Sequence, residues 1–430
     1  MASVQLLTAE QLTAYGSLSF SHSLFCSSAL PLRAVDSSAE LLYAIYYIYL
    51  QLRRPIVTHS QLHAESKRWL KQDLSRVEAS LGPKLEMLLG KKVLLTGAAG
   101  FLGFSFLHFF AHINSSQPDN RKITVTAVDN FLRGRPRWVS ELAASDPTVV
   151  LKVFDASQPW PDEEGVFDFV IHGASIASPK VYRQYPLETL DANIAGLRHM
   201  LELARRTKCK SILNFSSSEI YGDPPANEIP TTESYRGHVA CIGPRACYDE
   251  SKRVGETLCY LYAKHYGVPV KIVRPFNNYG PGLRLTDGRL LPDLCRDVLA
   301  DRDIVLYSDG SPTRTFCYAS DALSGYLLAL LSPHEGEPFN IGTSSPEISI
   351  RDFSAMLLRV AGSRREIKCM KSAEAEYLTD NPQRRCPNIS KAISMLGYQP
   401  QVNLEYGLQR SLEWYRKFHE LEHTEDAVRT

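Results

Sequence analysis

Short apolar runs alternate with longer segments of helical periodicity from residue 92 onward. Each run is short enough to be one buried strand, whereas the segments between them repeat their apolar residues at helical spacing. The runs cover residues 92–96, 123–128, 149–154, 167–171, 211–215 and 270–274. Strands that alternate with helices are typical of a parallel sheet covered by helices on both faces. The pattern therefore predicts an α/β fold built on a doubly wound parallel sheet.

The regular alternation ends at a turn-rich segment, residues 275–281. Beyond it the pattern is irregular, and we expect a smaller C-terminal α/β part at residues 276–420 that binds a substrate. Some of its segments should be exchanged with the sheet domain at residues 91–275. Its helices are expected near residues 290–300, 320–331, 350–360 and 403–418.

The first ninety residues stand apart as an N-terminal helical extension. A capping box at residues 37–40 opens a predicted helix over 40–52, and a second helix is expected over 60–81 before Gly82 and Pro83 stop it. No residues with evident chemistry occur here. The two helices could form a lid or a partner-binding pair, but we favour an extension that packs on the main domain.

Composition excludes several classes of function. Lys and Arg total 48 and Asp and Glu total 47, so no electrostatic field favours nucleic acid or an anionic membrane. The nine cysteines include no Cys-x-x-Cys pair, which argues against a zinc site or a disulfide framework and indicates a reducing compartment. The longest apolar run, residues 41–50, is shorter than the roughly 20 residues of a membrane span. With no evident secretory signal, a cytoplasmic protein is expected.

A glycine-rich turn follows the first predicted strand and precedes an apolar helix. Gly97 permits the tight turn, Gly100 lets the backbone approach a pyrophosphate, and Gly103 lets helix and strand pack closely. The helix N-terminus, at Phe101 and Leu102, would then face the phosphate charge. Strand, glycine turn and helix in this order predict a Rossmann-type dinucleotide-binding domain.

Acidic residues end the next two strands. Asp129 suits the two hydroxyls of an adenosine ribose and repels a 2′-phosphate, so NAD is favoured over NADP, with Asn130 beside it. Arg133 and Arg135 follow closely and could soften that preference. Asp155, after the third strand, is a candidate for the adenine amino group.

Tyr248 and Lys252 lie four residues apart on a predicted helix and therefore share one face. A cation near a tyrosine favours the phenolate, so the pair can take a proton from a sugar hydroxyl while hydride leaves the same carbon. The alternative is a buried tyrosine beside a snorkelling lysine. Ser217 and Glu219 follow the fifth strand, where ligands of open α/β sheets bind, and should reach the same pocket.

From Gly97 onward the chain resembles the extended short-chain dehydrogenase/reductase superfamily of NAD-dependent nucleotide-sugar epimerases, dehydratases and decarboxylases. Within it the sequence is most similar to the UDP-glucuronate decarboxylases, or UDP-xylose synthases. The resemblance covers roughly residues 92–418 and leaves the first ninety unexplained. The matching motifs are GPRACYDE at 243–250, VDNF at 128–131, DGR at 287–289, TRTF at 313–316 and NPQRR at 381–385.

The resemblance implies a mechanism. Tyr248 removes the C4 hydroxyl proton, Lys252 lowers its pKa and holds the nicotinamide ribose, and Ser217 relays the proton. Hydride passes to NAD, and the resulting β-keto acid loses CO₂ before C4 is reduced again. Glu219 manages the C5 proton or water, and Arg385 lies near the substrate carboxylate.

Further assignments also come from the resemblance. The substrate-binding residues are expected to be Tyr182, Asn193, Asn277, Arg289 and Arg314, with the arginines suited to a diphosphate. The family relationship also implies a homodimer joined through a four-helix seam.

The sequence departs from the decarboxylase pattern at a few positions. Asp191 precedes Asn193 where a lysine is usual, His199 stands where an asparagine is expected, and Gly282 replaces an arginine. A nucleotide-sugar 4-epimerase or 4,6-dehydratase is therefore the alternative. A dehydratase would carry an acid at the position of Ser218, and a 4-epimerase needs no Glu219. A non-catalytic binding protein of this fold is disfavoured by the intact Tyr248.

Overall fold

The computed structural model describes residues 59–161, 165–371, 379, 381–418 and 424–425. The predicted helix at 40–52 and its capping box lie outside these residues. None of the helices in the described part combines the length and apolar character needed to traverse a bilayer.

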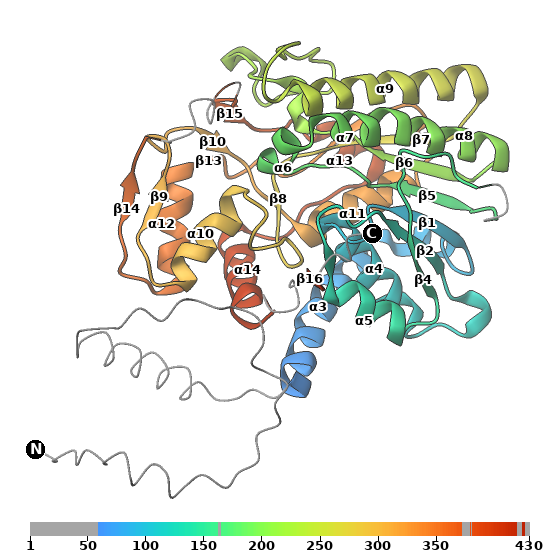
Figure 1. The fold of residues 1–430 in the computed structure, drawn as a ribbon, viewed down its shortest axis with the longest axis horizontal. Helices are drawn as coiled ribbons and strands as arrows, with labels where there is room; N and C mark the ends of the chain where they lie inside the picture. Colours follow the sequence, from blue (N-terminus) through green and yellow to red (C-terminus); the bar gives the residue numbers. More distant parts are fainter. Residues whose placement is uncertain (1–58, 162–164, 372–378, 380, 419–423, 426–430) are drawn as a thin grey trace, which may run out of the picture. The chain divides into compact units, whose positions relative to one another are not determined.

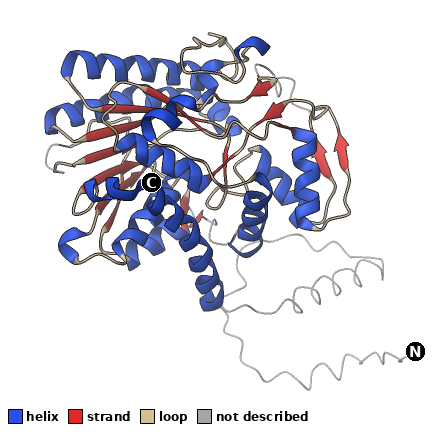
Figure 2. Cartoon of the chain, turned by 180° about the vertical axis from the view of Figure 1, so that it is seen from behind, coloured by secondary structure: helices blue, strands red, loops and turns tan. Residues whose placement is uncertain are grey.

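A seven-stranded parallel sheet forms the centre of the described chain (Figures 1 and 2). Its order is β12-β7-β6-β5-β1-β2-β4, so the chain runs outward from β1 in one direction and then in the other. The strands are β1 (Lys92–Thr96), β2 (Thr124–Asp129), β4 (Val149–Val153), β5 (Phe169–His172), β6 (Ser211–Phe215), β7 (Val270–Pro275) and β12 (Pro338–Ile341). This is the doubly wound sheet that the sequence predicts, and the six expected strands form within two residues of their predicted bounds. The order reverses between β1 and β5, where such folds bind ligands.

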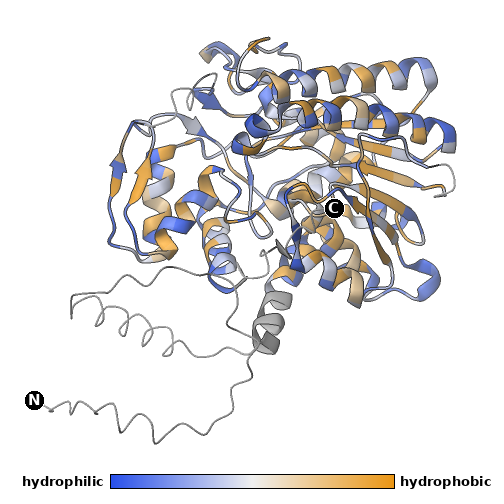
Figure 3. Ribbon diagram, in the orientation of Figure 1, coloured by the Kyte–Doolittle hydropathy of each residue, from blue (hydrophilic) through white to orange (hydrophobic). Residues whose placement is uncertain are grey.

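Helices cover both faces of this sheet, whose strands are largely hydrophobic (Figure 3). Towards one face lie α4 (Phe101–Asn114) and α11 (Ala319–Leu330), and towards the other lie α8 (Leu197–Thr207) and α9 (Ala246–Tyr266). Smaller helices complete the fold: α5 (Arg137–Ser145), α6 (Pro179–Gln184), α7 (Pro186–Asp191), α10 (Leu290–Leu299), α12 (Ile350–Ala361), α13 (Ser390–Leu396) and α14 (Leu404–Phe418).

Helices α7 and α8 are joined by one π-helical turn, Ala192–Gly196. At Gly196 a Cβ would lie 3.1 Å from the carbonyl oxygen of Ala156, so the helix approaches the backbone that follows β4 closely. The widened turn therefore sits where α7 and α8 press on the sheet edge.

Helix α3 (His59–Leu81) is the second predicted N-terminal helix, and it packs against α4 and α11. Its Leu74 and Val77 are buried in the main hydrophobic cluster. The buried hydroxyl of Tyr318 donates to Asp73 Oδ2 at 2.8 Å, which ties α3 to the start of α11. Helix α3 is therefore packed on the main domain and does not form a lid.

The C-terminal part combines short strands with α10, α12 and α14. Strand β10 (Thr313–Arg314) lies between β13 (Ile348–Ser349) and β15 (Arg384–Arg385), and β9 (Ile304–Leu306) pairs with β14 (Ile367–Cys369). Strand β12 instead joins the central sheet beside β7. The chain thus returns to the central sheet at β12 after the short strands β9 and β10.

Candidate active site

A cavity of about 1020 Å³ opens at the carboxyl ends of the central strands and extends under the C-terminal part. Its lining collects residues from segments that are far apart in the sequence. Among them are these predicted site residues: Gly97, Gly100, Phe101, Leu102, Asp129, Asn130, Asp155, Tyr182, Ser217, Glu219, Tyr248, Lys252, Asn277, Arg289, Arg314 and Arg385. Gly103 and Asn193 lie outside this lining.

The turn after β1 leaves no room for side chains. A Cβ on Gly97, where φ is +70°, would lie 2.6 Å from the carbonyl carbon of Gly173. A Cβ on Gly103 would lie 2.2 Å from the carbonyl oxygen of Ala98. Both contacts are shorter than van der Waals contact and involve backbone, so these glycines set the shape of the turn. Gly103 contributes by packing rather than by lining the cavity.

Asp129 links the glycine turn to the loop after β2. Its Oδ2 accepts from the Ala99 amide at 3.0 Å and its Oδ1 accepts from the Phe131 amide at 2.8 Å. Burial raises the pKa of Asp129 against these hydrogen bonds. Each oxygen of the Asp129 carboxylate can accept a further hydrogen bond. Asp129 can therefore hold the turn and also accept a hydrogen bond from a ribose hydroxyl. Nearby, Asn130 Nδ2 donates to Asp155 Oδ2 at 3.5 Å.

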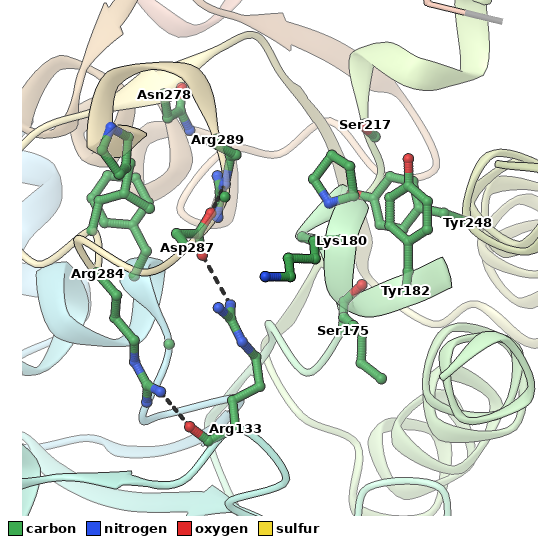
Figure 4. Close-up of a pocket in the computed structure, with 18 of the residues that line it drawn as sticks. Arg133, Ser175, Lys180, Tyr182, Ser217, Tyr248, Asn278, Arg284, Asp287 and Arg289 are labelled. Atoms are coloured by element: carbon green, nitrogen blue, oxygen red, sulfur yellow. Dashed lines mark hydrogen bonds and ion pairs between the residues drawn. The ribbon is translucent and has the colours of Figure 1, made fainter. Parts of the chain in front are cut away.

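The two arginines after Asp129 are engaged elsewhere. Arg133 forms an ion pair with Asp287, which is only 2% exposed, at 2.9 Å, and the carboxylate of Asp287 also pairs with Arg289. Arg284 donates to the carbonyl oxygen of Arg133 (Figure 4). Arg135 lies over the ring of Phe131 at 5.1 Å. The loop after β2 is thereby tied to the loop before α10.

Tyr248 and Lys252 share one face of α9, as their spacing predicts. Lys252 Nζ donates to the carbonyl oxygen of Phe215 at 2.8 Å and lies 5.6 Å from the centre of the Tyr248 ring. Tyr182 stacks on Tyr248 with ring centres 5.3 Å apart (Figure 4). Ser217 Oγ accepts from the Glu219 amide at 3.2 Å, so it also caps the turn after β6.

The electrostatics of the pair differ from the expectation. Burial raises the pKa of Tyr248 to about 12, although a hydrogen bond with Ser217 opposes this. Burial lowers the pKa of Lys252 to about 7. The prediction that Lys252 makes the phenol acidic is wrong for the protein alone, because burial favours the neutral form of both groups.

Glu219 lies between two buried guanidinium groups. Its Oε2 accepts from Arg245 Nη2 at 2.6 Å and from Arg385 Nη2 at 2.7 Å. Burial alone would raise the pKa of Glu219, but Arg245, Arg385 and Arg314 outweigh it and hold the pKa at about 2. Glu219 is therefore a carboxylate at every practical pH. Arg385 Nη1 also donates to Asn277 Oδ1 at 3.3 Å.

Two members of this charged cluster were missed by sequence reasoning. Arg245 and Asp249 occupy the motif that contains Tyr248, and their helical spacing of four was the available signal. Arg245 Nε lies 3.5 Å from Asp249 Oδ2. Burial, with the charge of Glu219, raises the pKa of Asp249 to about 7.

The remaining predicted substrate residues are already bonded within the protein. Arg314 donates to the carbonyl oxygens of Gln383 at 3.1 Å and Pro382 at 2.6 Å, so it supports the segment that carries Arg385. Asn193 Nδ2 donates to Ser251 Oγ at 2.9 Å beneath α9. Within the described residues, no group of His, Cys, Asp or Glu could hold a metal ion.

Comparisons with known proteins agree with this geometry. A model described as "NAD dependent epimerase/dehydratase family" matches residues 93–342. UDP-glucuronic acid decarboxylase 1 from Xenopus tropicalis is 40% identical over 334 residues, 77% of this chain and 73% of that protein. UDP-glucuronic acid decarboxylase 6 from Arabidopsis thaliana is 35% identical over 329 residues, 76% of this chain and 89% of that protein.

A solved structure of UDP-glucuronic acid 4-epimerase from Bacillus cereus, in complex with UDP-glucuronic acid and NAD, shares the fold. It is 26% identical with a TM-score of 0.63, covering 76% of this chain and 99% of that one.

The cavity fits NAD, the cofactor of this family. A Cβ at Gly97 or Gly103 would collide with backbone atoms, so no side chain fills the turn where the phosphates would bind. No side chain caps the first turn of α4 at Gly100, which leaves the helix N-terminus to an anionic group. Asp129, Asn130 and Lys252 line the same cavity.

Proposed function

Given that the chain belongs to the NAD dependent epimerase/dehydratase family, we propose that it decarboxylates UDP-glucuronate to UDP-xylose. Two relatives that match most of this chain carry the name UDP-glucuronic acid decarboxylase. One observation in the site carries the proposal. Glu219, at the end of β6, is fixed as a carboxylate between the buried side chains of Arg245 and Arg385.

The carboxylate-binding group is Arg385. Its guanidinium lines the cavity that also contains Tyr248, and a planar fork of donors suits a carboxylate. Its Nη2 donates to Glu219, whereas its buried Nε has no hydrogen-bond partner among the described residues. A substrate carboxylate would share or replace that contact, which selects sugars that carry an acid on C5.

Tyr248 is the proton acceptor for the C4 hydroxyl, and Ser217 relays that proton. NAD bound in this cavity would supply the acceptor and donor of the C4 hydride and a positive charge that favours the phenolate. Lys252, whose ammonium donates to the Phe215 carbonyl, would hold the nicotinamide ribose. Oxidation at C4 makes the sugar a β-keto acid, which releases CO₂ because the departing electrons delocalise into the ketone. Glu219 then directs a proton to C5.

The diphosphate of the sugar nucleotide would bind away from the carboxylate site, at Arg289. Arg289 lines it and has its guanidinium oriented by Asp287, with Asn277 nearby. Bidentate pairing of arginine with phosphate oxygens would hold the nucleotide in place. Tyr182, stacked on Tyr248, would define the wall beside the sugar.

We also propose a homodimer joined through α7, α8 and α9. Leu187 is 69% exposed on α7, and Val254, Tyr260 and Leu261 are exposed on α9. An apolar surface of this kind is typical of an interface. Sedimentation of a single 430-residue species at micromolar concentration would exclude the dimer.

The activity is tested by incubating the protein with UDP-glucuronate and NAD and following the products by mass. The expected result is CO₂ together with UDP-xylose. A product of unchanged mass, isomeric at C4, would instead identify a 4-epimerase, which the likeness to the Bacillus cereus enzyme makes the second candidate. Loss of water would identify a dehydratase.

A further inference from the structure

Asp249 is a buried carboxyl beside the Glu219 cluster that the mechanism above leaves without a role. It is 5% exposed, and its Oδ1 accepts no hydrogen bond from the described residues. Its Oδ2 lies 3.5 Å from Arg245 Nε. One other nitrogen of that guanidinium is already bonded, because Arg245 Nη2 donates to Glu219 at 2.6 Å.

The cluster therefore shares its positive charge among competing carboxyls. Arg245 faces both Glu219 and Asp249, and Arg385 faces Glu219. Arg314 lies behind them and donates to backbone carbonyl oxygens. Because Glu219 receives two close ion pairs, Asp249 is the weakly compensated member. A buried carboxyl with one shared cation readily accepts a proton when another anion arrives.

The proposed reaction brings such an anion and later removes it. The substrate carboxylate binds at Arg385, which adds a negative charge next to Glu219. Loss of CO₂ takes that charge away, and the carbon left behind requires a proton. The net decarboxylation of a carboxylate consumes one proton, so the site must take one from somewhere.

We infer that Asp249 stores this proton: it is protonated when a carboxylated sugar nucleotide binds and is deprotonated when CO₂ leaves. The inference rests on the proposed function. The C5–C6 bond breaks and its electrons pass to the C4 ketone oxygen as an enolate. They return to form C5–H with the proton, while the O–H bond of Asp249 breaks and leaves its electrons on the carboxylate. The sum is C5–COO⁻ plus Asp249–COOH giving C5–H, CO₂ and Asp249–COO⁻, so the charge of the site is the same before and after.

The other ionisable groups around Asp249 are poor proton stores near neutral pH. Glu219 has a pKa of about 2, whereas burial raises the pKa of Tyr248 to about 12 and also raises those of Tyr182 and Cys247. The pKa of Asp249 is about 7. Glu219 lines the cavity and shares Arg245 with Asp249, so Asp249 is separated from the cavity by one guanidinium group and responds to charge that arrives there.

Lys252, one turn along α9, also has a pKa of about 7, lowered by burial. It faces the Phe215 carbonyl rather than the arginine cluster. Lys252 is therefore the competing source of any proton uptake, and the experiment must separate the two.

The test measures proton uptake on binding by calorimetry, with NAD-loaded protein that carries Tyr248→Phe so that no turnover occurs. UDP-glucuronate is titrated in buffers of different ionisation enthalpy. If Asp249 is half protonated when free at pH 7 and fully protonated in the complex, uptake is about half a proton at pH 7 and approaches about one at pH 8. UDP-glucose and UDP-xylose, which lack the carboxylate, should take up none.

Adding Asp249→Asn should abolish the uptake, while Glu250→Gln, a partly exposed neighbour on the same helix, should leave it unchanged. Uptake that persists with Asp249→Asn assigns it to Lys252 or another group and overturns the inference. Absence of uptake by the Tyr248→Phe protein between pH 7 and 8 overturns it without any Asp249 variant. If the parent enzyme forms UDP-xylose but either result is obtained, only the inference fails; if the parent neither binds nor decarboxylates UDP-glucuronate, the proposed function fails as well.

Discussion

The two ends of the cavity are built by different kinds of interaction. At the cofactor end, Gly97 and Gly103 bring backbone segments so close that a single methyl group would collide with them. At the substrate end, the carboxylate of Glu219 is held between Arg245 and Arg385 by two short ion pairs. One end is shaped by steric exclusion and the other by charge compensation.

This difference determines how each end responds to its ligand. The glycine turn is already fixed by backbone contacts, so we expect a pyrophosphate to bind there with little rearrangement. The arginine cluster is already paired in part without a ligand, because Glu219 accepts from Arg245 and from Arg385. An incoming carboxylate must therefore redistribute existing contacts, and the affinity of this end depends on differences between ion pairs.

The largest effect on ligand binding is expected from Gly103→Ala, which changes the glycine turn at the cofactor end. The new Cβ would lie 2.2 Å from the Ala98 carbonyl oxygen, so the turn must move and NAD binding should fall by roughly a hundredfold or more. Bound NAD, measured after gel filtration, reports the loss. Gly255→Ala, whose Cβ would meet only a side-chain tip of Leu197 at 3.2 Å, is the matched control. Normal NAD content in the Gly103 variant would refute the steric account.

Tyr248→Phe tests the chemistry between the two ends. Removing the proton acceptor should lower kcat by about a thousandfold, within the range for general acid–base groups, while NAD content and the thermal midpoint stay unchanged. Tyr235→Phe, which alters a ring stacked on Tyr221 instead, should keep full activity. Retention of activity by the Tyr248 variant would remove this residue from the mechanism.

Arg385→Ala tests the substrate end of the cavity. It leaves Glu219 with one guanidinium partner and removes the proposed carboxylate contact, so UDP-glucuronate binding should weaken by about 2 to 3 kcal/mol, roughly 30- to 150-fold. NAD binding should be unaffected. The adjacent Arg384 pairs with Glu347 and is half exposed, so Arg384→Ala should be nearly silent. If the parent bound UDP-glucose and UDP-glucuronate equally, Arg385 would have no role in selecting the acid.

The smallest effect is a pH dependence of stability confined to the charged end. The pKa of Asp249 is raised in the folded protein, to about 7, so its stabilising contribution is fully present below its unfolded pKa and is lost as pH rises towards 7. Between pH 5 and 8 the free energy of unfolding should fall by on the order of 1 to 2 kcal/mol relative to Asp249→Asn. Urea unfolding of both proteins measures this. Glu219, with a pKa of about 2, should contribute no slope in that interval.

The cofactor end could be predicted from the sequence because its signals are local. Strand, turn and helix follow one another between residues 92 and 114, and the acid after the second strand sits at a fixed distance along the chain. Tyr248 and Lys252 are likewise linked by the period of one helix. Short-range geometry was sufficient for all of these.

The substrate end of the cavity could be predicted from the sequence only in part. Glu219, Arg245 and Arg385 come from three distant segments, and their ion pairs depend on how β6, α9 and β15 meet. The resemblance supplied Glu219 and Arg385 separately, without their contact. The pKa of Tyr248 was misjudged because it depends on burial by the surrounding fold, which spacing along a helix does not reveal.

The position of β12 has a consequence for synthesis of the protein. The outer edge of β7 is covered only when residues 338–341 pair with it, and α11, which lies against β6 and β7, also comes from this later part of the chain. While the ribosome is still making the intervening residues, β7 presents unpaired amide and carbonyl groups on a strand rich in valine and isoleucine. Such an edge invites pairing with other nascent chains. Protection by chaperones should therefore be needed most during translation of the segment between β7 and β12.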